Sequence, residues 1–275
     1  MTGRRRGPSA LTLGVFIIAG LLLAGPAGAA PMIALVIDDM GRSPRSGQAV
    51  LDLPGPLACA FLPYAPYTRD LAEAAHRRGK EVLLHLPMQS MEHRPLDRGA
   101  LLLDMSEAQV VATLRDDLAR VPHVIGVNNH MGSLLTRHPG HMLWVMRELK
   151  RSGDLFFLDS RTSADTVARL VALENDVPSV SRHVFLDDDP AEAAVERQFE
   201  RLLAVAERRG AAIAIGHPRP ATLRVLERAL PRLEERGVRL VPASTLVKWQ
   251  QERDKAWLAS SSPWHRVVKN WKRLR

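Results

Sequence analysis

Polar side chains that could bind a metal ion or transfer protons follow several short apolar runs of this 275-residue sequence. Aspartate, asparagine and histidine recur among them, and these types supply metal ligands, general acids and general bases. The residues concerned are Asp38 and Asp39 after the run 33–37, His85 within 81–86, residues 128–133 after 124–127, residues 159–162 after 155–158, and His217 after 211–215. Because the carboxyl ends of parallel strands converge on one face, five such ends predict one shared site.

The chemistry that these residue types permit is metal-assisted hydrolysis. Asp38 and Asp39, with His85 and His130, offer oxygen and nitrogen ligands to Zn²⁺ or a similar divalent cation. Three protein ligands leave a position open for water, while a second carboxylate could take a proton and a further histidine could donate one. Covalent catalysis is disfavoured, because there is no G-x-S-x-G motif and the single cysteine, Cys59, lies in an apolar run where we expect it to be buried.

These residues need a scaffold of alternating strands and helices, and the sequence predicts one. Near-continuous apolar runs are typical of parallel strands buried on both faces. Strands are expected at 33–37, 57–62, 81–86, 124–127, 155–158, 211–215 and 238–241, and helices at 68–78, 106–119, 139–151, 190–209 and 221–236. This alternation, with no linker that divides it, indicates a single α/β domain whose sheet is either closed like a barrel or doubly wound.

Local patterns predict where two of the helices begin. Ser106 followed by Gln109 predicts a capping box at the start of one helix. Asp189 followed by Pro190 predicts an N-cap with proline at the first helical position of another. The three aspartates at 187–189 are accordingly interpreted as charges that cap this helix and complement its dipole.

The formal net charge of +8 resides at the two ends of the chain. Residues 1–30 carry three arginines and no acid, and residues 251–275 carry seven cations against two acids. The remaining body, 31–250, has 28 basic and 28 acidic residues and is neutral. A protein that binds duplex nucleic acid needs a dense basic face, so we expect no nucleic-acid partner.

Residues 1–30 have the features of an export signal. Three arginines precede the apolar run 11–24, and Ala27-Gly28-Ala29 fits the small-x-small pattern of a cleavage site. The alternative is an uncleaved anchor, although a run of 14 residues is shorter than the roughly 20 that span a bilayer. Either interpretation places the body in a bacterial periplasm, and the second would anchor it to the inner membrane.

The basic C-terminal tail, residues 251–275, is rich in tryptophan. Four of the five tryptophans lie between 249 and 271, interleaved with lysines and arginines. This combination suits contact with an anionic membrane surface, or stacking on single-stranded nucleic acid. A closing helix followed by a solvated tail is the simpler interpretation.

Six short segments share their order and spacing with a known family. They are Ile37-Asp38-Asp39-Met40-Gly41, His85-Leu86-Pro87-Met88, Asn128-Asn129-His130-Met131-Gly132-Ser133, Phe157-Leu158-Asp159-Ser160, Val184-Phe185-Leu186-Asp187-Asp188 and Ile215-Gly216-His217-Pro218. Over roughly 32–247 the chain resembles the divergent (YibQ-like) polysaccharide deacetylases, distant relatives of the NodB-type carbohydrate esterases. The resemblance implies a distorted (β/α) barrel with a metal-ion site at its strand ends.

The resemblance also implies a set of metal ligands and a base. It makes Asp38 the candidate base and Asp39 a metal ligand, and His85 matches the first histidine of the family's His-x-x-x-His motif. Gln89 stands where the second histidine of that motif is expected. His130 is the candidate replacement, which gives Asp39, His85 and His130 as ligands of a divalent metal, with Zn²⁺ preferred.

Further roles follow from the same resemblance. His217 matches the late Leu-x-His position that protonates the leaving group, although Ile215 replaces the leucine. Asp159 lies where a supporting carboxylate would orient a histidine. Asn129 and Ser133 are candidates for contact with substrate, and their simpler role is to fix the loop backbone.

Three functions compete. The leading hypothesis is a periplasmic, metal-dependent hydrolase that removes acetyl groups from an acetylated envelope polysaccharide. The second is a catalytically inactive periplasmic carbohydrate-binding or scaffolding protein with a vestigial site, which Gln89 favours and the retained Asp38, Asp39 and His217 oppose. The third is another metal hydrolase, such as an amidase or phosphoesterase. The neutral body disfavours the phosphoesterase, because it provides no excess positive charge to attract a phosphate substrate.

Overall fold

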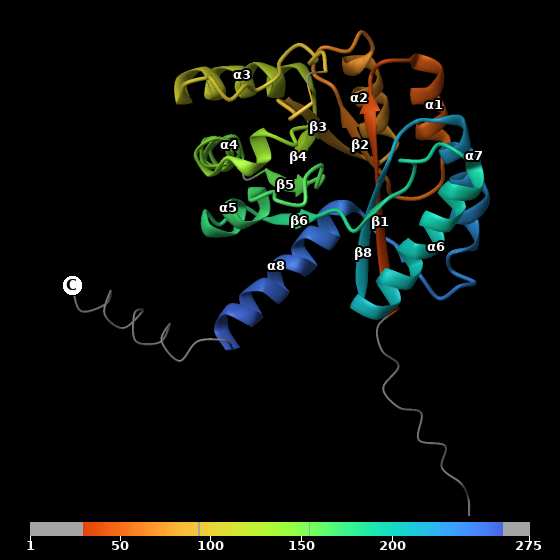
Figure 1. Ribbon diagram of the computed structural model, residues 1–275. Helices are drawn as coiled ribbons and strands as arrows, with labels where there is room; N and C mark the ends of the chain where they lie inside the picture. The colour runs from red at the N-terminus through yellow and green to blue at the C-terminus, as the bar shows by residue number, and fades with distance from the viewer. Residues whose placement is uncertain (1–29, 93, 154, 261–275) are drawn as a thin grey trace, which may run out of the picture.

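A curled, parallel β-sheet lies at the centre of the molecule, and helices cover its outer face (Figure 1). The structure is a computed structural model that describes residues 30–92, 94–153 and 155–260. Within these residues the sheet has nine strands in the order β6-β5-β4-β3-β2-β1-β8-β7, with β9 beside β1. The strands are β1 (Met32–Met40), β2 (Ala58–Phe61), β3 (Glu81–Met88), β4 (Val124–Met131), β5 (Phe156–Asp159), β6 (Ser179–Ser181), β7 (Val184–Phe185), β8 (Ala211–Gly216) and β9 (Arg239–Leu240).

Most helices connect one strand to the next, as expected for parallel strands. They are α1 (Pro44–Asp52), α2 (Thr68–Arg77), α3 (Glu107–Arg120), α4 (Pro139–Arg151), α5 (Ala168–Glu174), α6 (Glu192–Arg209), α7 (Pro220–Ala229) and α8 (Ala243–Ser260), with short 3₁₀ turns at Leu135–Arg137 and Leu230–Arg232. All five predicted helices are present, α1 and α5 are additional, and α8 corresponds to the closing helix expected before the C-terminal tail. The helix predicted at 221–236 ends early, because Pro231 cannot continue its hydrogen bonding and the chain tightens into a 3₁₀ turn.

The predicted distorted (β/α) barrel is confirmed as a single domain with an incompletely closed sheet. β6 pairs with β5, and β7 pairs with β8, so the short segment 179–185 joins the two edges of the curled sheet. Every strand pairing in the described residues is parallel. Sequence analysis missed β6 and β7: β6 has three residues, two of which are serines, and the two apolar residues of β7 are too few to form a recognisable run.

The strands are apolar on both faces because each face has its own core. On β1, Leu35 and Ile37 pack outward against the helices, and Val36 packs inward. The inner core also contains Leu246 and Val247 of α8, which contacts β1, β6 and β8. In Figure 1, α8 lies at the end of the molecule where β1 begins, so it fills the amino end of the sheet and leaves the carboxyl end open.

Helix starts follow local hydrogen bonding, and one prediction is wrong. The capping box is confirmed: Ser106 Oγ accepts from the Gln109 N–H, and the Gln109 side chain accepts from the Ser106 N–H. α6, however, begins at Glu192 rather than Pro190. Asp189 Oδ1 accepts from the Ala191 N–H, which is a local turn ahead of the helix rather than an N-cap.

Cys59 is fully buried in β2, as predicted. Burial raises the pKa of its thiol to about 12, so the sulfur is held in its unreactive protonated form. The residue therefore acts as a small apolar side chain in the outer core.

The predictions for the two termini fall largely outside the described residues. Of the export signal predicted at 1–30, only residue 30 is described. Of the basic tail at 251–275, residues 251–260 belong to α8 and residues 261–275 lie outside the described residues. No helix among the described residues is both long and apolar enough to cross a lipid bilayer.

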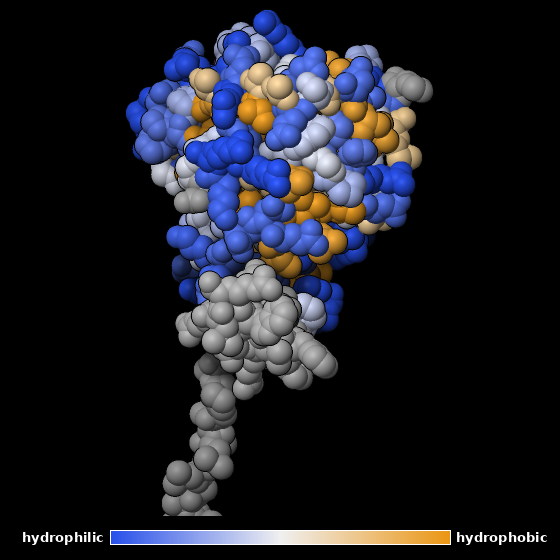
Figure 2. Space-filling view, turned by 90° about the vertical axis from the view of Figure 1, so that its left-hand side faces the viewer, coloured by the Kyte–Doolittle hydropathy of each residue, from blue (hydrophilic) through white to orange (hydrophobic). Residues whose placement is uncertain are grey.

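The face on which α3, α4 and α5 lie is mostly hydrophilic, with some apolar side chains gathered on it (Figure 2).

Candidate active site at the strand ends

A pocket of about 710 Å³ opens at the carboxyl ends of the strands. Its walls come from β1, β3 and β4, from the segments after β5 and β8, and from a loop at 94–97. The polar lining residues are Asp38, Asp39, Arg42, His85, Arg94, Asp97, Asn129, His130, Ser160, Thr162 and His217. The five strand ends singled out from the sequence therefore surround one pocket.

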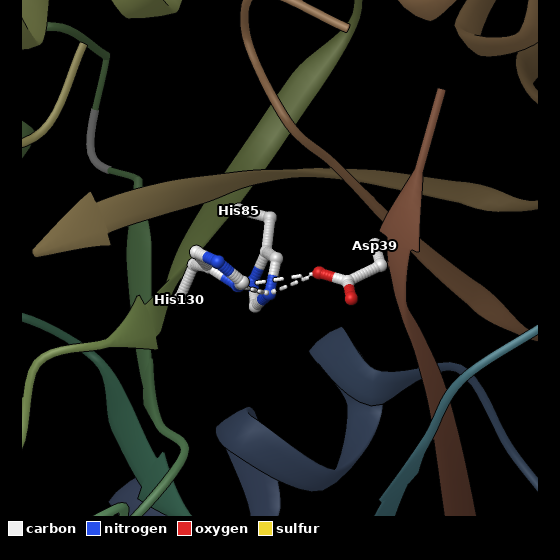
Figure 3. Close-up of side chains that lie close together, drawn as sticks. All are labelled: Asp39, His85 and His130. Carbon is white, nitrogen blue, oxygen red and sulfur yellow. Dashed lines mark hydrogen bonds and ion pairs between the residues drawn. The ribbon is translucent and has the colours of Figure 1, made fainter. Parts of the chain in front are cut away.

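Three potential metal ligands point toward one another in this pocket (Figure 3). Asp39 Oδ1 lies 3.5 Å from His85 Nε2 and 3.2 Å from His130 Nδ1, and the two histidine nitrogens are 3.0 Å apart. Ligands bound at about 2.0–2.1 Å in a tetrahedral zinc site lie roughly 3.3 Å from one another. The spacing and chemistry of these side chains therefore fit a divalent cation such as Zn²⁺.

A β-bulge allows two consecutive aspartates to face the same pocket. Side chains of a regular strand alternate between faces, yet Asp38 and Asp39 both line the cavity. The pairing of β1 with β2 shifts register between Ile37 and Met40, and Asp39 adopts a left-handed φ of 55°. The extra residue and the left-handed turn redirect the strand end, at a backbone cost of about 1–3 kcal/mol that is common at functional sites.

Asn128 fixes the tautomer of His85. The Asn128 Nδ2 donates to Asp38 Oδ1 at 2.8 Å, so its Oδ1 is left to accept from His85 Nδ1–H at 2.9 Å. In the neutral imidazole the Nε2 then carries the lone pair, and this is the atom that faces Asp39 and His130. Holding the far ring nitrogen in this way is the usual means of orienting a metal-binding histidine.

The cluster contains buried polar atoms that lack hydrogen bonds. Within the described residues, Asp39 Oδ1 is shielded from solvent and accepts no hydrogen bond, although two histidine nitrogens surround it. Burial alone would raise the pKa of Asp39, but His130 and His85 lower it well below its usual range. An ionised oxygen without a hydrogen-bond donor is an environment that a cation would satisfy.

His130 has a carboxylate on its outer side. His130 Nε2 lies 3.1 Å from Asp97 Oδ2, although the angle is not that of a hydrogen bond. Asp97 is in turn held by Arg42 at 2.8 Å. The loop that contains Asp97 therefore positions a negative charge behind the imidazole, with the Nδ1 left to face the cluster.

Asp38 is buried next to the three potential ligands, with 3% of its surface exposed. Its Oδ2 lies 3.6 Å from His85 Nε2, and its Oδ1 accepts from Asn128. Burial raises the pKa of Asp38, and the neighbouring His85 and His217 offset only part of that effect. A carboxylate with a raised pKa is a stronger base than an exposed one.

Asp187 orients His217, which corrects the interpretation of Asp187 as a helix-capping charge. Asp187 is fully buried; its Oδ1 lies 2.9 Å from His217 Nδ1, and its Oδ2 accepts from the His217 N–H and from Thr222 Oγ1. The His217 Nε2 is directed to the pocket, 4.0 Å from Asp39 Oδ2. Burial by itself would lower the pKa of His217, but Asp187 and Asp38 raise it, which favours the protonated ring.

Asp159 does not take the predicted supporting role. Its Oδ1 accepts from the Arg161 N–H and its Oδ2 from Thr166 Oγ1, and no hydrogen bond or ion pair joins it to a histidine of the described residues. Asp159 thus stabilises the turn that leads from β5 to α5. The carboxylate that supports a histidine comes instead from the segment after β7.

Gln89 is directed away from the metal cluster. Its Oε1 accepts from the Leu103 N–H at 2.7 Å, and its backbone carbonyl accepts from the N–H groups of Leu134 and Leu135. The position where the resemblance led us to expect a second histidine therefore braces two loops. The second histidine of the cluster is His130, from β4.

The two predicted substrate-binding residues hold loops. Asn129 Nδ2 donates to the Met131 carbonyl and Asn129 Oδ1 accepts from the Ser160 N–H, so it joins the ends of β4 and β5 beside the pocket. Ser133 Oγ accepts from the Met91 N–H and lies outside the pocket lining. Sequence analysis missed Asn128, whose role depends on its register opposite His85.

Comparisons with known proteins agree with this fold. Residues 35–247 match the family described as divergent polysaccharide deacetylase. The chain is 40% identical over 237 residues to the uncharacterized protein YibQ of Escherichia coli (strain K12), which covers 86% of this chain and 74% of that protein. It is 41% identical over 221 residues to an uncharacterized protein of Haemophilus influenzae, which covers 80% and 78%.

A solved structure shows the same fold at lower identity. It is an uncharacterized protein from Agrobacterium tumefaciens C58, with a TM-score of 0.76, 24% sequence identity, and coverage of 80% of this chain and 90% of that one. The family match spans most of the chain, and the curated relatives exceed 30% identity over most of it. The chain therefore belongs to the divergent polysaccharide deacetylase family.

Proposed function

We propose that this protein is a metal-dependent hydrolase that removes acetyl groups from an envelope polysaccharide in the periplasm. The observation that carries the proposal is the cluster of Asp39, His85 and His130, whose ligand atoms lie 3.0–3.5 Å apart. A buried carboxylate and a carboxylate-supported histidine adjoin the cluster. Family membership supports carbohydrate deacetylation as the reaction class, and residues 1–30 support export.

The chain's own residues divide the chemistry as follows. A divalent cation held by the three ligands would supply Lewis acidity toward the acetyl carbonyl and a water of lowered pKa. Asp38, oriented by Asn128, accepts a proton from the attacking water. His217, whose Nδ1 is bonded to Asp187, presents Nε2–H to the departing amine or alcohol and donates its proton.

The environments of Asp38 and His217 support this division of base and acid, because each raises the pKa of its residue in the way that its role requires. Burial raises the pKa of Asp38, which makes its carboxylate a better proton acceptor at neutral pH. Asp187 and Asp38 raise the pKa of His217 despite its burial, which keeps that ring protonated to higher pH. Neighbouring groups held in complementary protonation states are what a hydrolase with a separate base and acid requires.

A catalytically inactive binding or scaffolding protein is the alternative, and one observation favours it. Gln89, in place of the second motif histidine, serves the loops and not the cluster. Against this alternative, a protein that only binds sugar has no use for a proton acceptor and a supported proton donor beside three potential ligands. The two functions differ in turnover, which is directly measurable.

Acetate release tests the proposal. The purified chain is assayed on a panel of acetylated envelope glycans before chelation, after chelation, and after Zn²⁺ is restored. We expect release that depends on the metal and falls by at least about 10³-fold in Asp38→Asn, because the proton acceptor is lost. Release that survives Asp38→Asn removes Asp38 from the role of base, and a metal-loaded chain that binds glycans without releasing acetate supports the inactive alternative.

A further inference from the structure

A second pocket, distinct from the active site, is lined by four arginines. It measures about 230 Å³ and lies where the segment 179–183, the end of α6 and α8 meet. Arg161, Arg169, Arg182 and Arg209 line it together with His183, and none of the described residues that line it is an aspartate or glutamate. The overall neutrality of residues 31–250 therefore conceals a strong local excess of positive charge.

The arginines of this pocket are poorly neutralised. Only Arg169 forms an ion pair among the described residues, with Asp254 at 2.6 Å. Arg182 uses its Nε and Nη2 to donate to the backbone carbonyls of Ser160 and Arg161. Elsewhere on the surface the pattern is different: Arg228 of α7, and Arg236 beyond it, are each paired with glutamates of α6. Gathering like charges around a pocket whose described lining contains no carboxylate costs free energy that a bound anion would recover.

A helix dipole does not explain the cluster. Arg209 belongs to the last turn of α6, where a cation stabilises the helix end. The other three arginines come from the β5–α5 turn, from α5 and from the residue after β6, so no single helix end can account for them. The pocket assembles its charge from four separate elements.

His183 adds a neutral donor to the wall. Its Nδ1 accepts from the Ile213 N–H, so the neutral ring carries its proton on Nε2. Burial and the surrounding arginines lower the pKa of His183 to about 4, which keeps it neutral at physiological pH. Guanidinium groups and an imidazole N–H offer several donors to one small anion.

We propose that this pocket binds a phosphate group, either of a phospholipid headgroup or of a soluble phosphate compound. A phosphate monoester has three strong acceptor oxygens and a charge near −2, whereas the phosphodiester of a phospholipid keeps two acceptor oxygens and a single negative charge. In both, the acceptor oxygens match the planar fork of an arginine guanidinium. The small volume suits a compact anion rather than a glycan chain, for which the larger active-site pocket is available. The site is independent of the proposed hydrolysis.

The composition of the chain beyond the pocket favours a membrane as the source of the phosphate. Gln250 of α8 lines it, and Arg253 of the same helix donates to the Arg209 carbonyl at its edge. The chain that follows α8 carries five further cations and two tryptophans in its sequence. The sequence that follows α8 thus has a composition that also suits an anionic surface, which favours a headgroup phosphate as the ligand.

Thermal unfolding of the full-length chain in inorganic phosphate tests for the site. We expect about 20 mM phosphate to raise the Tm by roughly 2–4 °C over chloride at equal ionic strength. The double variant Arg161→Gln/Arg209→Gln, which alters two exposed side chains outside the catalytic residues, should lose at least half of that shift. Arg228→Gln/Arg236→Gln removes the same charge from paired arginines and should keep it. A shift no larger than that in chloride, or one retained in the first variant, overturns the proposal.

Vesicle sedimentation distinguishes the two sources of phosphate. Phosphatidylcholine vesicles with and without about 30% phosphatidylglycerol are incubated with the same three proteins, all of which keep residues 1–30. Retention that requires phosphatidylglycerol, falls in Arg161→Gln/Arg209→Gln and is competed by phosphate supports a headgroup ligand. A phosphate-dependent Tm shift without a difference in retention supports a soluble ligand, and the absence of both effects contradicts the site.

Discussion

The two ends of the sheet are built from the same strands but contain opposite kinds of side chain. At the carboxyl end, β1 finishes in a bulge with a left-handed aspartate, and ionisable groups such as Asp38 and His85 are buried beside one another. At the amino end, the inner face is apolar and α8 inserts Leu246 and Val247 into it. The carboxyl end therefore contains backbone strain and buried ionisable groups, and the amino end contains a packed apolar core.

This division explains how the fold tolerates its site. A bulge, a left-handed non-glycine residue and partly unsatisfied carboxylates each cost free energy in the folded state. Burial of a leucine-sized side chain contributes about 1.5–3 kcal/mol, and the inner core around α8 supplies many such contacts. Substitutions at the two ends should therefore separate ligand binding from stability.

Loss of a ligand at the carboxyl end is expected to have the largest effect. His130→Ala removes one of three groups around the cluster, so we expect the affinity for Zn²⁺ to fall by at least about 100-fold while the fold is retained. Competition with a chromophoric chelator measures the affinity. His76→Ala, which removes an exposed histidine on α2, is the matched control and should change nothing. Equal affinities in the two variants would exclude His130 as a ligand.

Truncation at the amino end should have the opposite signature. Leu246→Ala leaves a cavity in the inner core, and we expect it to lower the free energy of unfolding by about 3 kcal/mol. Zn²⁺ affinity below the unfolding transition should stay within about twofold, because no ligand moves. Denaturant unfolding and metal titration of one preparation give both quantities. Glu252→Ala, an exposed change on the same helix, should cost less than about 0.5 kcal/mol. A large loss of affinity in Leu246→Ala would show that the two ends are coupled.

Replacement of the carboxylate behind His217 should have an intermediate effect and a distinctive pH dependence. Asp187→Asn keeps the shape of the side chain but removes the charge that raises the pKa of His217. Because His217 acts as a proton donor, activity is lost as the pH rises through its pKa, so the loss should begin at lower pH in the variant. We also expect kcat/KM to fall by about 10–100-fold.

The neighbouring residue provides the control for that pH profile. Asp188 is exposed, so Asp188→Asn makes the same chemical change outside the contact with His217. Its profile should match that of the unchanged protein. If both variants keep the original basic limb, Asp187 does not set the pKa of His217 and its role is purely structural.

The scaffold could be predicted from sequence because burial leaves a direct pattern. Strands covered on both faces must be apolar throughout, which made β1 and β8 visible as runs, and the amphipathic helices between them followed. β6 and β7 were missed because they are too short to create such a pattern. The convergence of five polar strand ends then followed from the parallel topology alone.

The individual contacts of the site could be predicted less well, because they depend on distances across the fold. Asp187 stands in a row of three aspartates before a helix, a pattern that indicates capping, and its contact with His217 joins residues 30 positions apart. The role of Asn128 required the register between β3 and β4. The left-handed turn that brings Asp39 beside Asp38 leaves no trace in residue type, since aspartate also occurs in regular turns.

Gln89 is a residue that is only partly interpretable from sequence, and its substitution is expected to have the smallest effect on stability and on metal affinity. Its mismatch with the family motif is visible in sequence, but its contact with the Leu103 N–H is visible only in the fold. Gln89→Ala leaves that N–H without its acceptor, so we expect a loss of about 1–2 kcal/mol in the free energy of unfolding. Zn²⁺ affinity should be unchanged, because the side chain is outside the cluster. Gln48→Ala, at an exposed position of α1, should alter neither quantity.

The pair of measurements on Gln89→Ala decides whether the motif position still belongs to the site. Lower stability with unchanged Zn²⁺ affinity means that the position now serves the loops alone and that His130 has taken over ligation. Lower affinity with unchanged stability would mean that Gln89 turns toward the cluster when the metal binds. In that case Gln89, the residue after β3, would belong to the polar end of the sheet and not to its supporting loops.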